Sequence, residues 1–424
     1  MHTNTIRMLA ALTACALVIA ACGRAPTPVD SVSLSSQLAG ENEVPAVATM
    51  ASGDVTATLT GSTLEISGSF EGLMSDLNVV GGSSAHIHSA PAGENGGIVE
   101  GLTVTSTDAR SGTVSGTLEL DADALADFEA GDFYVNIHTT GNPSGELRAQ
   151  LMADAPTFGD VMHLFDAAML PENEVHDVLS GATGSAFGLL RDDDTLTVSG
   201  TFANLESALF EVGDVGPAHI HEGVAGVNGG VVFPLDVAAN DAMTAGRFGV
   251  STTVSNAQIE TLLMGGFYLN VHTEGENSGE IRGQLFPTEV TMTATLEGAQ
   301  EVAIEPVVTT ATGTATATTN GFSLLLDGAF GGLSSTLQNV GDVGPAHVHR
   351  GARGVNGPVQ FALDVDADLD MLGGTLSADV VLSEAERADF LAGLHYVNVH
   401  TVNFPGGEIR GQLDEAVAVS ANHD

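Results

Sequence analysis

The chain has 424 residues with eleven arginines and no lysine, and its 54 acidic residues give a formal net charge of -43. A chain this acidic repels nucleic acid and anionic lipid, which excludes a nucleic-acid-binding protein and favours multivalent cations or basic proteins as partners. The length is enough for two to four domains.

The N-terminus predicts an export signal. Arg7 precedes an apolar run over 8–21, which is too short to span a membrane. Residues 19–23, Ile-Ala-Ala-Cys-Gly, resemble a bacterial lipoprotein signal. That resemblance implies lipidation of Cys22 and sorting to an outer membrane, on its periplasmic or outer face. The alternative is ordinary cleavage near an incidental cysteine. The only other cysteine, Cys15, lies within the signal, so the mature chain has no disulfide.

Three sequence blocks then recur three times in the same order. They are Ala-His-x-His, Tyr-x-Asn-x-His-Thr and Gly-Glu-x-Arg-x-Gln-Leu. The first histidine precedes the third by 52, 53 and 53 residues, and the arginine follows the third by ten in every copy. The histidines are His86, His88 and His138 in copy one, His219, His221 and His272 in copy two, and His347, His349 and His400 in copy three. The accompanying polar residues are Asn136, Glu146 and Arg148, then Asn270, Glu280 and Arg282, then Asn398, Glu408 and Arg410.

The repeat sets the domain organisation. Copies begin about 130 residues apart, which is the size of a domain and not of a solenoid unit. The predicted segments are a signal peptide at 1–22, a linker at 23–31, domains at 32–152, 160–286 and 290–414, and a tail at 415–424.

Strand patterns dominate each copy. Residues 54–59, 63–70 and 112–120 alternate polar and apolar side chains between glycine-rich turns, which indicates half-buried antiparallel strands. One short helix is predicted before each Tyr-x-Asn-x-His strand. In copy three it covers 383–391, with Ser383 as N-cap and Glu386 three residues later. The predicted fold is all-β, with three tandem antiparallel sandwich or barrel domains.

Strand parity predicts one polar face in each domain. Neighbouring side chains on a strand point to opposite faces, so the two histidines of each pair lie together, as do Asn398 and His400, or Glu408, Arg410 and Gln412. Since the aliphatic faces form the core, we expect the polar faces to form one surface. The hairpin loop after His400 sets that histidine close to Arg410, or directly opposite it. If the His-x-His strand lies beside this hairpin, three imidazoles converge.

Two interpretations of the histidines remain open. They bind a metal, for which neutral imidazole suits copper or zinc. Alternatively, they form a hydrogen-bonded polar ladder, with Glu408 paired to Arg410. The glycine-rich loop after each His pair lacks the lysine of a phosphate-binding loop. Copy one differs in this loop, with Ser89-Ala90-Pro91, so the metal-site interpretation applies best to copies two and three.

The ordered blocks resemble the CHRD domain, over nearly the whole mature chain and three times. This resemblance implies an all-β, immunoglobulin-like domain on exported proteins, with no established biochemical activity. Copy three departs by placing His395 where the other copies have Phe133 and Phe267; its parity predicts a structural, core-facing role. A weaker likeness is to copper–zinc superoxide dismutase, which also uses a β-barrel, a His-x-His pair and an arginine. A bridging histidine, a disulfide and a fourth copper ligand are missing here.

We therefore predict an exported protein held at the membrane by a lipid anchor, with a non-enzymatic binding or structural role and a protein or surface ligand. No cofactor is assigned. The first alternative is a copper- or zinc-binding protein with one His-x-His plus His site per domain. The second is a superoxide-dismutase-like metalloenzyme.

Overall fold

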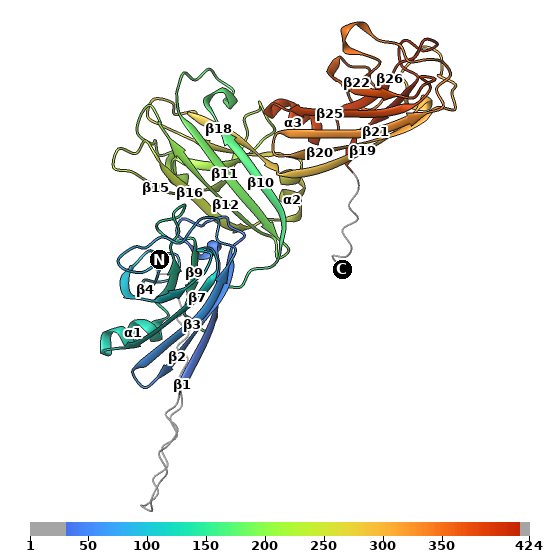
Figure 1. Cartoon of the computed structure of the whole chain (residues 1–424). Helices are drawn as coiled ribbons and strands as arrows, with labels where there is room; N and C mark the ends of the chain where they lie inside the picture. The colour runs from blue at the N-terminus through green and yellow to red at the C-terminus, as the bar shows by residue number, and fades with distance from the viewer. Residues whose placement is uncertain (1–30, 416–424) are drawn as a thin grey trace, which may run out of the picture.

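The computed structural model describes residues 31–415, and the predicted signal sequence and Cys22 lie outside this range. Nearly all regular structure within it is β, arranged in three similar units along the chain (Figure 1). The prediction of an all-β fold with one short helix per copy is confirmed. No helix in the described range is both long enough and apolar enough to cross a membrane.

Each unit repeats the same order of elements. Domain one contains β1 (Ser31–Leu38), η1 (Gly40–Asn42), β2 (Ser52–Thr60), β3 (Thr63–Glu71), β4 (Ala85–Ser89), β5 (Gly97–Gly101), β6 (Thr103–Thr105), β7 (Gly112–Glu119), α1 (Ala122–Ala130), β8 (Phe133–Ile137) and β9 (Leu147–Gln150). Domain two contains β10 (Val161–Met169), η2 (Pro171–Asn173), β11 (Thr183–Arg191), β12 (Thr195–Ala203), η3 (Gly213–Val215), β13 (Ala218–Glu222), β14 (Gly230–Pro234), β15 (Asp236–Ala239), β16 (Gly246–Thr253), α2 (Asn256–Leu263), β17 (Phe267–Val271) and β18 (Ile281–Pro287). Domain three contains β19 (Glu289–Glu297), η4 (Gly298–Gln300), β20 (Thr312–Asn320), β21 (Ser323–Gly331), η5 (Gly341–Val343), β22 (Ala346–Arg350), β23 (Val359–Ala362), β24 (Asp364–Ala367), β25 (Gly374–Val381), α3 (Glu384–Leu391), β26 (His395–Val399), β27 (Ile409–Gln412) and β28 (Asp414–Glu415).

The strands curl into a nearly closed antiparallel barrel. In domain two the order is β14-β13-β17-β18-β10-β11-β12-β16-β15, and domain three repeats it. Domain one divides the same order into sheets of four and five strands, joined by a bridge between Ala39 and Arg148. The outermost strands β5 and β6 are consecutive in the chain. Leu102 between them is buried in the core, and its amide donates to the Ala85 carbonyl at 2.8 Å.

Period-two alternation fills the interior of each barrel. On β3 the side chains of Leu64, Ile66 and Phe70 are buried in the core. The predicted helix of copy three is present as α3, and Ser383 and Glu386 form the expected capping box. Burial of Phe390 against the barrel anchors this helix, because its few other apolar residues cannot support an isolated helix of eight residues. His395 is buried beside Phe390 on the core side of its strand, as its parity predicted.

The domains contact one another through two different interfaces. Between domains one and two, Glu41 accepts a hydrogen bond from Arg191 at 2.7 Å, and the Ala48 amide donates to Ser199 at 2.9 Å. Between domains two and three, buried Arg387 of α3 donates to Asp166 and to the Pro287 carbonyl. Side chains from one domain are therefore satisfied by the next.

Gly249 makes the first interface sterically specific. A Cβ atom at this position would lie 2.1 Å from the Ala46 carbonyl oxygen, which belongs to the backbone of domain one.

We predict that Gly249→Ala separates domain one from domain two without unfolding either. Small-angle scattering should show a larger radius of gyration, and proteolysis within 152–160 should accelerate. The matched control is Gly230→Ala, where an added Cβ meets nothing within 4 Å. An unchanged scattering profile for Gly249→Ala would contradict this account.

Candidate metal centre

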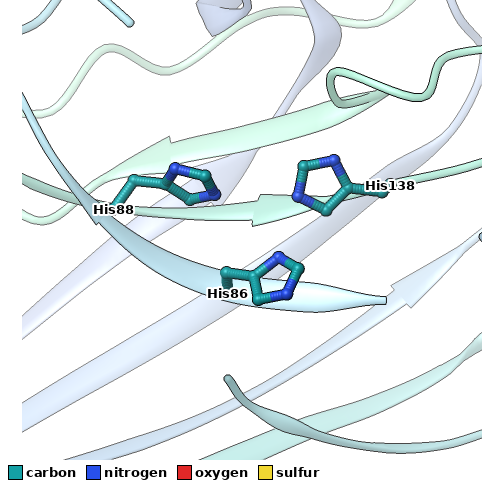
Figure 2. Close-up of side chains that lie close together, drawn as sticks. All are labelled: His86, His88 and His138. Carbon is teal, nitrogen blue, oxygen red and sulfur yellow. The ribbon is translucent and has the colours of Figure 1, made fainter. Parts of the chain in front are cut away.

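Three histidine side chains converge in every domain. His86 and His88 project from β4, and His138 follows directly after β8, the strand paired with β4 (Figure 2). The ring centroid of His86 lies 5.7 Å from that of His88 and 4.9 Å from that of His138. One ring nitrogen from each histidine lies within 4.8 Å of the others, and the same holds in domains two and three. The expected adjacency of the His-x-His strand and the hairpin is therefore present.

The polar face is buried, which corrects the expectation of a surface. Ala85 and Ile87 on β4 point into the barrel core, so His86 and His88 lie on the outer face of the same strand. Loops cover that outer face, and β4, β8 and β9 are consequently buried on both sides. Strand parity identified the residues that share a face but not the loops that enclose it.

Backbone carbonyls orient two of the three imidazoles. His88 Nδ1 lies 3.0 Å from the Gly96 oxygen, and His138 Nδ1 lies 3.0 Å from the Pro143 oxygen. A carbonyl oxygen only accepts, so each Nδ1 carries the proton and each Nε2 keeps its lone pair. The corresponding carbonyls hold the rings of domains two and three in the same way, at 3.0–3.1 Å.

The first histidine is held differently in copy one. In domains two and three, His219 Nε2 and His347 Nε2 donate to the Gly216 and Gly344 carbonyls at 2.8 and 2.9 Å, which leaves each Nδ1 free. His86 keeps only a weaker interaction with the Val80 carbonyl, and neither of its ring nitrogens has a hydrogen bond of ordinary geometry.

The preceding loop explains this difference. From Val80 to Ala85 it is one residue shorter than from Val212 to Ala218, and it lacks the short helical turn η3. The loop before the histidine pair, and not the loop after it, therefore distinguishes the site of copy one. The later loop keeps its contacts with His88 and Tyr134.

A tyrosine and the arginine support the second histidine. The His88 ring stacks on the Tyr134 ring, with centroids 5.0 Å apart. The Arg148 guanidinium lies 3.6 Å from the centroid of the same Tyr134 ring. Arg148 donates to the carbonyls of Glu94 and Pro91, at 2.8 and 3.2 Å. The stack and the hydrogen bonds together hold the glycine-rich loop after the histidine pair over the site. This tyrosine opens the repeated block Tyr-x-Asn-x-His-Thr, but the sequence alone assigned no role to it.

The hairpin register differs from the one expected. Arg148 lies opposite Asn136, and Arg410 lies opposite Asn398, so the arginine faces the asparagine two residues before the histidine. The last ladder pair is Ile137 with Leu147, and His138 already belongs to the loop. The loop is thus longer than a tight hairpin, which shifts the pairing by two residues and keeps side-chain parity.

The carboxylate of the third block does not pair with the arginine. Glu408 accepts hydrogen bonds from Thr309, Thr401 and Ser334, and no ion pair joins it to Arg410 within residues 31–415. Glu146 and Glu280 bond to the equivalent neighbours. These glutamates tie loops together, and none of their hydrogen bonds within residues 31–415 reaches an imidazole or the arginine, which corrects their assignment as partners of the arginine.

A family model for the CHRD domain matches residues 34–151, 165–285 and 292–413. The chain belongs to the CHRD family. No curated protein matches the chain. The three matched ranges each contain one histidine triad, so the triad is an internal feature of every CHRD domain in this protein.

A buried glutamic acid in each CHRD domain was not predicted as part of the site. Burial raises the pKa of Glu43 to about 8 and the pKa values of Glu174 and Glu301 to about 7, although Arg148, Arg282 and Arg410 oppose the shifts. Asn136 donates to one Glu43 oxygen at 3.4 Å. The repeated Glu-Val before each second strand is the sequence signal that would have identified these residues.

Burial keeps the imidazoles neutral. It lowers the pKa of His138, His272 and His400 to about 4, and the neighbouring histidines of each triad add to the shift. Burial also lowers the pKa of both histidines in each pair. At neutral pH the free nitrogens therefore offer lone pairs, the form in which imidazole binds metal.

The shifted histidines predict a stability change in acid. An unfolded histidine titrates near pH 6.5 and His138, His272 and His400 titrate near 4 in the fold, so the unfolded chain binds more protons between these values. Their contribution is constant above pH 6.5 and is lost as the pH falls toward 4. Urea unfolding of metal-free protein should therefore show a smaller loss between pH 7 and 4.5 when all three are changed to Gln. The glutamic acids titrate equally in both proteins, so equal losses would contradict the assignment.

Proposed function

We propose that each CHRD domain binds one copper or zinc ion through its three histidines. The observation that carries this proposal is the set of unpartnered ring nitrogens, one from each histidine, that face a common point in all three domains. In domains two and three, the other nitrogen of every ring donates a hydrogen bond to a backbone carbonyl. Histidine metal sites share this feature, because outer hydrogen bonds fix the orientation of the ligating ring.

The polar-ladder interpretation leaves these nitrogens unexplained. In a structural ladder each buried nitrogen would have a hydrogen-bond partner, and each unpaired buried polar atom costs about 1–3 kcal/mol of folding free energy. His88 Nε2 and His138 Nε2 are buried without such a partner, as are their counterparts in the other domains. An ion would compensate for three of these atoms in each domain.

The spacing suits an ion after a small adjustment. Bonds of about 2.0–2.1 Å from imidazole nitrogen place two ligands of one ion at most about 4.2 Å apart. One ring nitrogen from each histidine lies within 4.8 Å of the others. Three ligands arranged in a plane around one ion are about 3.6 Å apart, so each nitrogen needs to move toward the ion by at most about 0.7 Å.

We further propose that the protein acts by binding and not by catalysis, after export and lipidation at Cys22. The buried free nitrogens favour retention of an ion over access of a substrate to it. Three tandem sites on one anchored chain would present metal, or contact a protein or surface ligand, in several places at once. The superoxide-dismutase-like alternative would require a substrate path to the metal.

Metal stoichiometry tests the proposed sites. Anaerobic reconstitution of the purified mature chain with Cu or Zn, followed by desalting and elemental analysis, should give three ions per chain. Changing His138, His272 and His400 together to Ala should remove His-dependent binding, since each site loses one of its three ligands. The matched control is His395→Phe, which removes a buried histidine outside the triads. Background metal in the reconstituted wild type, or full retention by the triple variant, would overturn the proposal.

The looser His86 predicts a weaker first site. A chain with His272→Ala and His400→Ala keeps only site one, and a chain with His138→Ala and His400→Ala keeps only site two. Because outer hydrogen bonds to ligating histidines typically change metal affinity about 10–100-fold, site one should bind more weakly by a factor in that range. Competition with a chromophoric chelator measures both affinities, and equal values would refute the distinction.

A further inference from the structure

We infer that the triads prefer monovalent copper, Cu(I), over the divalent ions Zn²⁺ and Cu²⁺. This inference rests on the proposed metal sites and names the ion that suits them. It follows from the charge of the ligands, the cation behind them and the enclosure of the free nitrogens.

The ligand set contributes no negative charge. Each cluster consists of histidines alone, without a carboxylate or thiolate. An ion held there keeps its full charge inside the domain. The cost of moving an ion out of water rises with the square of its charge, so a divalent ion meets about four times the penalty of a monovalent ion of equal size. A neutral, buried ligand set therefore favours the lower charge.

A fixed cation lies behind each triad. The Arg282 guanidinium sits 3.5 Å from the Tyr268 ring centroid, and that ring stacks on His221 with centroids 4.8 Å apart. Arg282 donates to the loop carbonyls of Val224 and Val227, which are uncharged.

The same stack occurs in the other two domains, and the nearby glutamic acid offsets little of the charge. Arg148 and Arg410 lie 3.6 and 3.4 Å from the centroids of their tyrosine rings. Burial raises the pKa of Glu174 and Glu301 to about 7 and that of Glu43 to about 8, which lowers the negative charge beside each arginine at neutral pH. The arginine therefore repels a divalent ion twice as strongly as a monovalent one.

Enclosure of the free nitrogens acts against divalent ions as well. Zn²⁺ with three protein ligands normally completes its coordination with water, and Cu²⁺ prefers tetragonal sites with more ligands. The unpartnered nitrogens of each triad have almost no solvent exposure. Cu(I) has a filled d shell and imposes no such requirement, so three nitrogens suffice.

A direct competition tests the choice of ion. The full mature chain is incubated anaerobically with three equivalents each of Cu(I) and Zn²⁺, desalted and analysed for both elements. The variant with His138, His272 and His400 changed to Ala is measured alongside, to subtract ions held elsewhere. We expect about three His-dependent Cu(I) per chain with little Zn²⁺, and an X-ray absorption edge of Cu(I) with nitrogen neighbours.

The outcomes separate this inference from the proposed function. If His-dependent sites fill mainly with Zn²⁺, the preference for Cu(I) is wrong and the metal sites stand. If neither ion binds in a His-dependent way, both proposals fall.

The arginine has its own test in a chain that retains only site two. Arg282→Met should raise the affinity for Zn²⁺ relative to Cu(I) about tenfold, whereas Arg282→Lys, which keeps the charge, should change the ratio less. Arg387→Met removes a buried arginine that stacks on Phe286 away from the triad, and it should leave the ratio unchanged. Circular dichroism checks the fold of each variant. An unchanged ratio in folded Arg282→Met would overturn the role of the cation, and if that variant unfolds, the ion competition alone decides.

Discussion

The stacking of a buried arginine on a tyrosine is the interaction on which the outer face of each CHRD domain depends. The guanidinium of Arg410 lies 3.4 Å from the Tyr396 centroid and donates to the loop carbonyls of Ala352 and Val355. Without this clamp the glycine-rich loop would not cover the polar side of the sheet, and the imidazoles beneath it would be solvated. Their low pKa values follow from that cover, and so does the tautomer of His349, whose Nδ1 donates to the Gly357 carbonyl of the same loop.

Covering a polar sheet face buries many polar atoms, and loops supply partners for a large part of them. Gln150 donates to two loop carbonyls, and the Tyr134 hydroxyl accepts from the Gly96 amide. Glu146 ties Thr49, Thr139 and the Met74 amide together. The loops therefore serve as the second layer of the domain, and their glycines permit the close approach of backbone to ring that this layer requires.

Sequence patterns predicted the strands, the short helix and the faces that histidine, asparagine and arginine share, because these depend on local periodicity. They did not predict the enclosure of the face or the two-residue register shift that sets Arg148 opposite Asn136. Both depend on where loops lie in space, which alternation does not encode. Glu43 was overlooked for the same reason: its pKa of about 8 arises from burial by distant segments. The looser hold on His86 follows from one missing loop residue, a detail visible in the sequence only after the structure shows its consequence.

Repetition by itself does not separate structural residues from functional ones, because duplication copies both. The two kinds of residue differ in whether their polar atoms already have partners within the fold. Arginine, tyrosine and the third-block glutamate have contacts within their own domain that explain their presence. The free nitrogens of His221 and His272 have none within the described chain, although a fold of this size has many ways to pair a buried nitrogen. Hydrogen bonds orient these rings and leave their inner nitrogens unpaired; under the proposed function, a bound ion would pair those nitrogens and stabilise the domain.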